Sequence, residues 1–170
     1  MMLDLLHRSR IQFPGMGLGF LRRMADEALA HVQERHVGGR PLLSYDQVQR
    51  RVARLQASVT EAAAMCVFSA QRASVENDLS KEGLSANIVK SVLTDRMHDA
   101  AQSLLQLVGA KGYRLDHIAG RSVIDARPFQ IFEGSNDILY EQIATATLQA
   151  MRRAKEPRLG AFLSLSLIHI

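Results

Sequence analysis

The chain has 170 residues, of which 47% are hydrophobic and 22% are charged, and its formal net charge is +4. This length suits one domain with a substantial core, and the composition is that of an ordinary globular protein. The basic residues are scattered with few aromatic residues among them, and no long apolar run is present, so we expect neither a nucleic-acid surface nor a membrane span.

The cysteine and histidine content bounds the chemistry further. Cys66 is the one cysteine and lies in the apolar run Ala62–Val67, as is typical of a small core residue. A single cysteine forms no disulfide within the chain, which fits a reducing compartment such as the bacterial cytoplasm. The six histidines lack the spacing of metal ligands, so we expect no metal site.

The first predicted helix covers residues 17–34. Its apolar positions recur three and four residues apart, at Leu18, Leu21, Ala25, Ala28 and Val32. Residues 1–13 are partly amphipathic, and Pro14 with the glycines after it should distort any helix there. The glycine- and proline-rich segment His36–Leu43 ends the helix, and we expect no β-hairpin.

Two long helices are predicted next. Ser44 and Gln47 form a capping box for the second helix, which runs to about Ser74 or Leu79. Its apolar positions are Val48, Val52, Leu55, Val59, Ala62 and Cys66. After a polar turn, Ser85 caps a third helix. Its apolar positions are Val89, Leu93, Met97, Ala100, Leu104 and Val108.

The fourth predicted helix follows a loop at residues 109–120 and runs from Ser135 to about Ala154. It turns Leu139, Ile143, Ala146 and Ala150 inward. Four apolar stripes joined by short connections predict an all-α fold, an antiparallel four-helix bundle over residues 1–155. We expect the second helix to pack against the third through Val52, Leu55, Val59, Leu93, Met97 and Leu104.

One stretch before the fourth helix combines features of a ligand site. Glu133 follows an apolar segment and directly precedes Gly134, Ser135 and Asn136. Glycine lets the backbone approach a ligand closely, and free amides at a helix start favour an anion or an electron-rich acceptor. A desolvated carboxylate beside such a helix start suits a general base. The alternative is a surface acid near a helix dipole.

Four motifs in order resemble the acyl-CoA dehydrogenase family. The segment Phe132–Asn136 resembles its Phe/Tyr-Glu-Gly-Thr/Ser-Asn motif, and Gln106–Tyr113 resembles its Gln-x-x-Gly-Gly-x-Gly-Tyr/Phe motif. Asp125–Arg127 and the helix ending at Arg35 match two further segments. The resemblance covers about residues 3–154 and implies the family's carboxy-terminal helical domain alone. We therefore expect a fragment, with residues 156–170 an artefactual tail.

The resemblance implies α,β-dehydrogenation of an acyl-CoA thioester with FAD. Glu133 matches the family's base, which removes the α-proton, and its backbone N–H would donate to the thioester oxygen. Arg10 matches an arginine near the substrate site, and Gly134 belongs to the same site. Some members carry their base just before the position of Arg10, but Ser9 stands there in this chain. Glu133 is thus the one candidate base.

The resemblance also implies two sets of FAD contacts. Arg35 matches an arginine that reaches the pyrophosphate of a neighbouring subunit's FAD, and its guanidinium complements phosphate oxygens. Gln106, Gly109 and Ala110 match the loop that touches that same FAD. Ser135 and Asn136 match residues that contact the domain's own FAD. The sequence departs from the family pattern at Gly38, Asp46, Ala110 and Ile124.

Two functions follow as hypotheses. The first is the catalytic part of an FAD-dependent acyl-CoA dehydrogenase, inactive alone, which forms a homo-dimer or tetramer and passes electrons to electron-transfer flavoprotein. The second is a non-catalytic helical assembly module of a dehydrogenase-like or oxidase-like protein. Retention of Glu133, Arg10 and Arg35 favours the enzyme, because an assembly module needs none of them.

Overall fold

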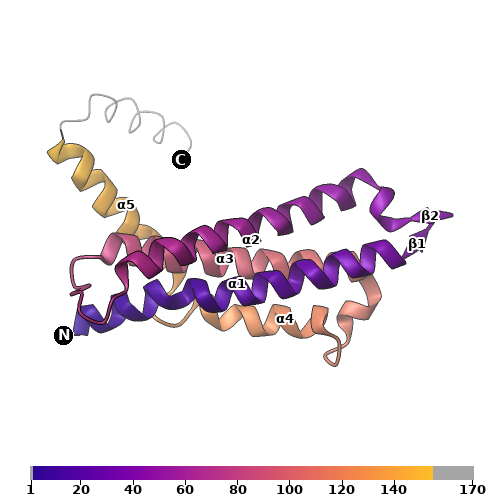
Figure 1. The fold of residues 1–170 in the computed structure, drawn as a ribbon, viewed down its shortest axis with the longest axis horizontal. Coiled ribbons are helices and arrows are strands. Elements are labelled where there is room, and N and C mark those ends of the chain that lie inside the picture. The colour runs from indigo at the N-terminus through magenta and orange to yellow at the C-terminus, as the bar shows by residue number, and fades with distance from the viewer. Residues whose placement is uncertain (1, 155–170) are drawn as a thin grey trace.

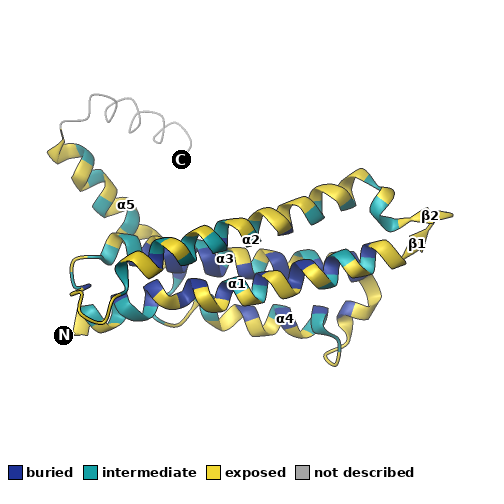
Figure 2. Ribbon diagram, in the orientation of Figure 1, coloured by how far each residue is buried: buried dark blue, intermediate teal, exposed yellow. Residues whose placement is uncertain are grey.

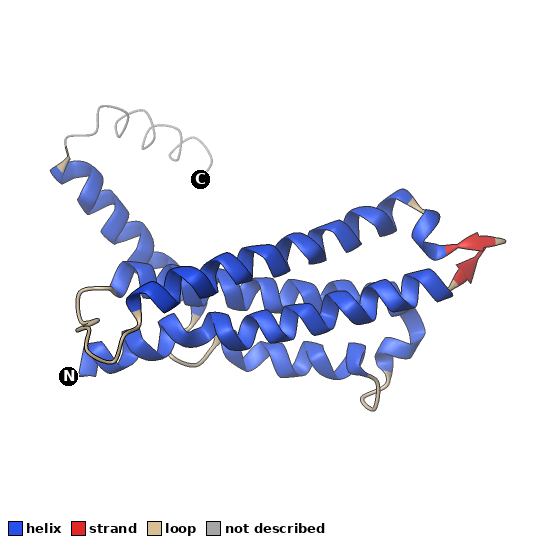
Figure 3. Cartoon of the chain, in the orientation of Figure 1, coloured by secondary structure: helices blue, strands red, loops and turns tan. Residues whose placement is uncertain are grey.

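The computed structural model describes residues 2–154, and almost all of them lie in helices (Figure 3). The elements are α1 (Met2–Glu34), β1 (His36–Val37), β2 (Arg40–Pro41), η1 (Leu42–Ser44), α2 (Asp46–Arg72), α3 (Gly83–Val108), η2 (Gly109–Tyr113), α4 (Ile118–Ala126), η3 (Arg127–Gln130) and α5 (Asn136–Arg153). The predicted all-α fold class is confirmed. The tail expected at residues 156–170 lies outside the described residues.

Helices α1 to α4 run up, down, up and down along one bundle axis, whereas α5 projects away from one end (Figure 1). The prediction had α5 as the fourth helix of the bundle, and this was wrong. Leu139 in its first turn is buried, but Ala150 is exposed, and Ile143 and Ala146 are only half-buried. The fourth bundle position belongs to α4, which begins within the region expected to be a loop.

Helix α1 is the centre of the bundle, because it packs most extensively against both α3 and α2. It is one continuous helix with Pro14 inside it. The helix therefore begins well before residue 17, where the predicted helix starts. Packing overrides the local propensity of Pro14 and the nearby glycines, since Phe13, Pro14 and Gly17 are all buried.

The core confirms the predicted stripe of α3, whose six apolar positions are all buried. On α2 only Leu55 and Ala62 of the predicted positions are buried, while Val52 and Val59 are half-buried. Helix α2 has α1 as its main partner and packs much less extensively against α3, which corrects the expected α2–α3 seam. Figure 2 shows the resulting exposed outer face of α2.

The predicted helix boundaries were wrong at both caps. Helix α2 begins after Tyr45, and the Ser44 hydroxyl donates to the carbonyl of Pro41 instead of capping. Helix α3 begins at Gly83, before the expected cap Ser85. Residues 36–41 also form a β-hairpin that was not expected. Its two strands have two residues each, and both glycines of its Gly38–Gly39 turn have positive φ angles.

The closest approach of α1 to α3 occurs at Gly17. A Cβ atom at this position would lie 2.5 Å from the Cδ2 atom of Leu93, whose side chain is 1% exposed. We expect Gly17→Ala to lower the free energy of unfolding by about 1–3 kcal/mol because the side chain overpacks the interface.

Gly19 on the same helix is the matched control, since a Cβ there meets nothing within 4 Å. Gly19→Ala should stabilise the chain by about 0.5–1 kcal/mol through helix propensity alone. Urea unfolding followed by circular dichroism measures both variants. Equal stability of the two would show that Leu93 moves aside without cost.

Candidate active site

The predicted base lies in an unusual backbone conformation between η3 and α5. Glu133 has a φ angle of 58°, the one positive φ among the non-glycine residues that the structure describes, and Gly134 follows at 93°. A long side chain in the left-handed region costs of order 1–3 kcal/mol, and such residues cluster at functional sites. The strain therefore marks Glu133 as a candidate functional residue on grounds independent of its motif.

Glycine is required at position 134 for two reasons. Its φ angle is positive, and a Cβ there would lie 3.0 Å from the Nη2 atom of Arg10 and 3.3 Å from the Cδ2 atom of Leu139. The backbone at Gly134 is thus pressed against a buried cation on one helix and a buried leucine on another.

Two cations from the bundle interior hold the backbone of this segment. Arg10 on α1 donates from Nε to the carbonyl of Glu133 at 2.8 Å, and Lys90 on α3 donates from Nζ to the carbonyl of Gly134 at 2.8 Å. Arg10 is 8% exposed and Lys90 is 0% exposed. Three helices therefore meet at the candidate base.

Burial perturbs both cations. Desolvation lowers the pKa of the Arg10 guanidinium, and the nearby Glu133 carboxylate offsets part of this effect. Desolvation, followed by repulsion from Arg10, lowers the pKa of Lys90 to about 8. The Oε2 atom of Glu133 is itself buried and has no hydrogen-bond partner among residues 2–154. A buried carboxylate oxygen without a partner is rare and is available to accept a proton.

A network of polar side chains extends this support. Asn136 turns its side chain into the bundle, where Oδ1 accepts from Lys90 at 2.8 Å and Nδ2 donates to Asp95 at 2.7 Å. The Asp95 carboxylate also accepts from Gln130 and from the Tyr140 hydroxyl. Burial, together with the hydrogen bond to Asp95, raises the pKa of Tyr140 to about 12. The start of α5 is thereby fixed to α3.

The backbone amides at this helix start have no side-chain cap. Ser135 is the N-cap residue of α5, but its hydroxyl makes no capping hydrogen bond. The first amides of a helix have no partner within the helix, so here they are available to a ligand. Because the side chain of Asn136 is bonded to interior groups, a ligand at this helix start would meet its backbone N–H.

The structure divides the candidate residues into two groups. Glu133, Gly134, Ser135 and Asn136 lie with Arg10 at the base of α5. Arg35 directly follows α1 at the other end of the bundle, where Gln106, Gly109 and Ala110 are exposed at the α3–η2 junction (Figure 1). Arg10 and Glu34 are 24 residues apart on one continuous helix, which spans about 36 Å at 1.5 Å per residue.

The second group is a connected surface. His31 lies near both parts of it, because the charges of Arg35 and Lys111 both act on its ring. Burial, with repulsion from Lys111 and Arg35, lowers the pKa of His31. Arg35 and the exposed Gly109–Ala110 turn thus lie at the same end of the bundle.

Sequence reasoning missed Lys90, Asn87 and Asp95. Asn87 accepts from the Nη1 atom of Arg10 at 2.7 Å and donates to Gln142. The available signal was periodicity, since Lys90 lies three residues before Leu93 and four after Ala86 on the buried face of α3. A lysine on an apolar stripe must find a polar partner in the interior.

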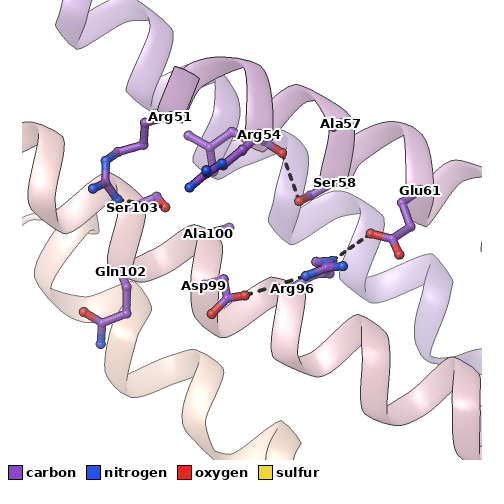
Figure 4. Close-up of a pocket in the computed structure, with 11 residues that line it drawn as sticks. Arg51, Arg54, Ala57, Ser58, Glu61, Arg96, Asp99, Ala100, Gln102 and Ser103 are labelled. Atoms are coloured by element: carbon purple, nitrogen blue, oxygen red, sulfur yellow. Dashed lines mark hydrogen bonds and ion pairs between the residues drawn. The ribbon is translucent and has the colours of Figure 1, made fainter. Parts of the chain in front are cut away.

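Two pockets adjoin the bundle without containing the candidate base. The first is a polar pocket of about 470 Å³ between α2 and α3, in which Arg96 pairs with Glu61 and Arg51 donates to Ser103 (Figure 4). The second is an apolar groove of about 640 Å³. It is lined by His98, Val123, Ile124, Arg127, Pro128, Ile131 and Phe132. This apolar groove borders the Glu133 segment directly.

The described residues hold no cluster of three metal-binding side chains. No helix within residues 2–154 is long and apolar enough to cross a membrane. The fold and the site together define a helical domain that presents a half-buried carboxylate, with one buried oxygen, next to an uncapped helix start.

Comparison with known proteins identifies this class. The family model described as "Acyl-CoA dehydrogenase, C-terminal domain" matches residues 1–148. The chain therefore belongs to the acyl-CoA dehydrogenase family, as the motifs indicated, and corresponds to its C-terminal domain.

Relatives and solved structures agree. The chain is 30% identical over 142 residues to cyclohexane-1-carbonyl-CoA dehydrogenase of Geobacter metallireducens, covering 83% of this chain and 36% of the relative. It is 29% identical over 133 residues to an acyl-CoA dehydrogenase of Bacillus subtilis, covering 78% and 34%. Butyryl-CoA dehydrogenase from Megasphaera elsdenii shares the fold with a TM-score of 0.76 at 22% identity, covering 86% and 37%. The chain thus spans about a third of its relatives' length.

Proposed function

We propose that this chain is the C-terminal part of an FAD-dependent acyl-CoA dehydrogenase and that Glu133 is the base that removes the α-proton of the substrate. The observation that carries the proposal concerns Glu133, whose buried Oε2 atom has no partner within residues 2–154 and whose strained backbone is held by two interior cations. A surface acid near a helix dipole would need neither burial nor this support.

The chain's own groups perform two tasks in this reaction. The Glu133 carboxylate accepts the α-proton, for which its desolvated oxygen is suited. The backbone N–H of Glu133 donates to the thioester oxygen, where negative charge develops as the proton leaves. When bound, FAD supplies the acceptor for the β-hydrogen, which leaves as hydride. Arg10 and Gly134 shape this substrate site from the interior side.

The chain's residues fit FAD at both ends of the bundle. The uncapped amides of Ser135 and Asn136 suit an electron-rich group of the domain's own cofactor. Exposed Arg35, at the same end of the bundle as the Gly109–Ala110 turn and Gln106, suits a pyrophosphate. Because the two groups lie about 36 Å apart along α1, we infer that they serve two different FAD molecules. This arrangement requires a homo-dimer or tetramer.

The proposal is tested in the intact enzyme of which this chain would form part. Under anaerobic conditions, an acyl-CoA of suitable chain length should bleach the absorbance of bound FAD. Electron-transfer flavoprotein should restore the absorbance if it is the partner, whereas rapid recovery with oxygen alone would indicate an oxidase. Failure of every acyl-CoA to bleach the flavin would favour the non-catalytic assembly module.

The exposed apolar groove predicts self-association of the isolated chain. Ile124 is 58% exposed, Ile131 is 55% exposed and Phe132 is 43% exposed, and contiguous exposed apolar surface of this kind marks interaction sites. We expect sedimentation velocity at micromolar concentration to show dimers or larger species, and Ile124→Ser to weaken the association. A clean monomer of the unmodified chain would contradict this prediction.

A further inference from the structure

Lys90 is the largest side chain that the bundle buries completely. Its Nζ atom makes two hydrogen bonds at 2.8 Å, to the carbonyl of Gly134 and to Oδ1 of Asn136. Both partners belong to the segment that joins the candidate base to α5, and neither is charged. Lysine is almost never buried completely unless it is paired, so this arrangement needs an explanation.

Packing alone does not explain Lys90. An apolar side chain of similar volume would fill the same space without the desolvation penalty, which is visible in the lowered pKa of Lys90. Its neighbours on the buried face of α3, Ala86 and Leu93, pack without any such penalty. The two hydrogen bonds to the Glu133 segment are what an apolar residue would not provide.

These hydrogen bonds set the direction of the backbone amides. In a planar trans peptide the carbonyl and the N–H point in opposite directions. When Lys90 holds the Gly134 carbonyl on the interior side, the N–H of Ser135 points away from the interior. Arg10 does the same for the Glu133 carbonyl and the N–H of Gly134. Both restrained residues have a positive φ angle.

We propose that Lys90 is a positioning residue for the base: by holding the Gly134 carbonyl it keeps Glu133 in the left-handed conformation that presents its carboxylate to the substrate. This proposal rests on the proposed function for its catalytic consequence. Its structural content, that Lys90 fixes the conformation of residues 133–136, stands independently of any reaction.

The test uses Lys90→Met in the intact holoenzyme. Methionine has a similar length but no donor, and Lys81→Met is the matched control because Lys81 is exposed. We expect the single-turnover rate of flavin bleaching, per bound FAD, to fall about 10–100-fold in Lys90→Met, since small misplacements of a reacting group cost this much. The isotope effect with α-deuterated acyl-CoA should increase while the KM changes little. Lys81→Met should match the wild type.

Hydrogen–deuterium exchange gives a readout that needs no activity. Peptides containing residues 133–136 should exchange faster in Lys90→Met than in Lys81→Met, and peptides from the α1 core, residues 21–32, should not change. Equal exchange of residues 133–136 in the two variants would overturn the proposal. So would a Lys90→Met bleaching rate per flavin equal to that of the wild type.

Two further outcomes are decided in the same experiment. If Lys90→Met does not fold, Lys90→Gln replaces it under the same criteria, since its shorter side chain keeps a polar group but cannot span to Gly134. If none of the acyl-CoA substrates bleaches the flavin of the wild-type enzyme, the proposed function is wrong. Hydrogen–deuterium exchange of residues 133–136 alone then decides the role of Lys90.

Discussion

Glu133→Gln should reduce the rate of acyl-CoA dehydrogenation by about 10²–10⁴-fold while FAD stays bound, because loss of a general base costs this much. Glutamine keeps the shape of the side chain and a polar tip but cannot accept the α-proton. The backbone restraints from Arg10 and Lys90 act on carbonyl groups and not on the carboxylate, so they survive the substitution. Flavin absorbance measures retention, and anaerobic bleaching measures the chemistry.

Glu141→Gln is the matched control, because Glu141 is exposed on α5 eight residues further along the chain. This variant removes the same charge and should keep wild-type turnover. If Glu133→Gln also kept near-normal turnover with bound flavin, Glu133 would be an ordinary helix-end acid and the base would come from outside this chain.

The bundle was predictable where one periodicity extends over a whole helix. The stripe of α3 is buried at every predicted position, because a helix covered on several sides must keep its apolar period. The stripe of α2 is less informative. Half-buried Val52 and Val59 show that this helix is covered mainly on the side that faces α1, and periodicity alone does not reveal the partner.

The sequence predicted α5 as the fourth helix of the bundle, whereas α4 takes that place in the structure, and this difference has a physical cause. Helix α4 has only nine residues, and glycines surround its start, so propensity indicates a loop. Its burial of Ala119, Ser122 and Ala126 depends on contacts with α3 that are distant in sequence. Helix α5 has an amphipathic pattern that suited the bundle, yet beyond Leu139 its apolar positions are at most half-buried by the described chain.

Motifs proposed the residues of the candidate site, whose roles stay predictions, but the sequence did not indicate what supports them in the fold. Motifs identified Glu133, Arg10 and Arg35, which the structure places at two ends of α1. The left-handed backbone of Glu133 and the two cations beneath it depend on three helices meeting, and no local pattern encodes that meeting. A lysine on an apolar stripe was the one visible sign of it.

Arg35→Ala should weaken FAD binding by about 10–100-fold, because a hydrogen bond to a charged group contributes about 1.5–3 kcal/mol. The residue lies exposed at the end of α1, far from Glu133, so its loss removes a phosphate partner without touching the base. Arg23→Ala on the same helix is the control, since Arg23 is exposed and pairs with Glu27. Flavin retention on dilution or gel filtration measures the difference.

Mixed oligomers of Arg35→Ala and Glu133→Gln subunits decide how the two ends of the bundle cooperate. If each FAD meets Arg35 of one subunit and Glu133 of its partner, a mixed dimer contains one site with both residues intact and one site with neither. Such a dimer should regain up to half of the wild-type activity, although both parent variants are defective. If Arg35 and Glu133 served the same FAD from one chain, every site in the mixture would carry one defect and no activity would return. The separation of about 36 Å along α1 favours recovery.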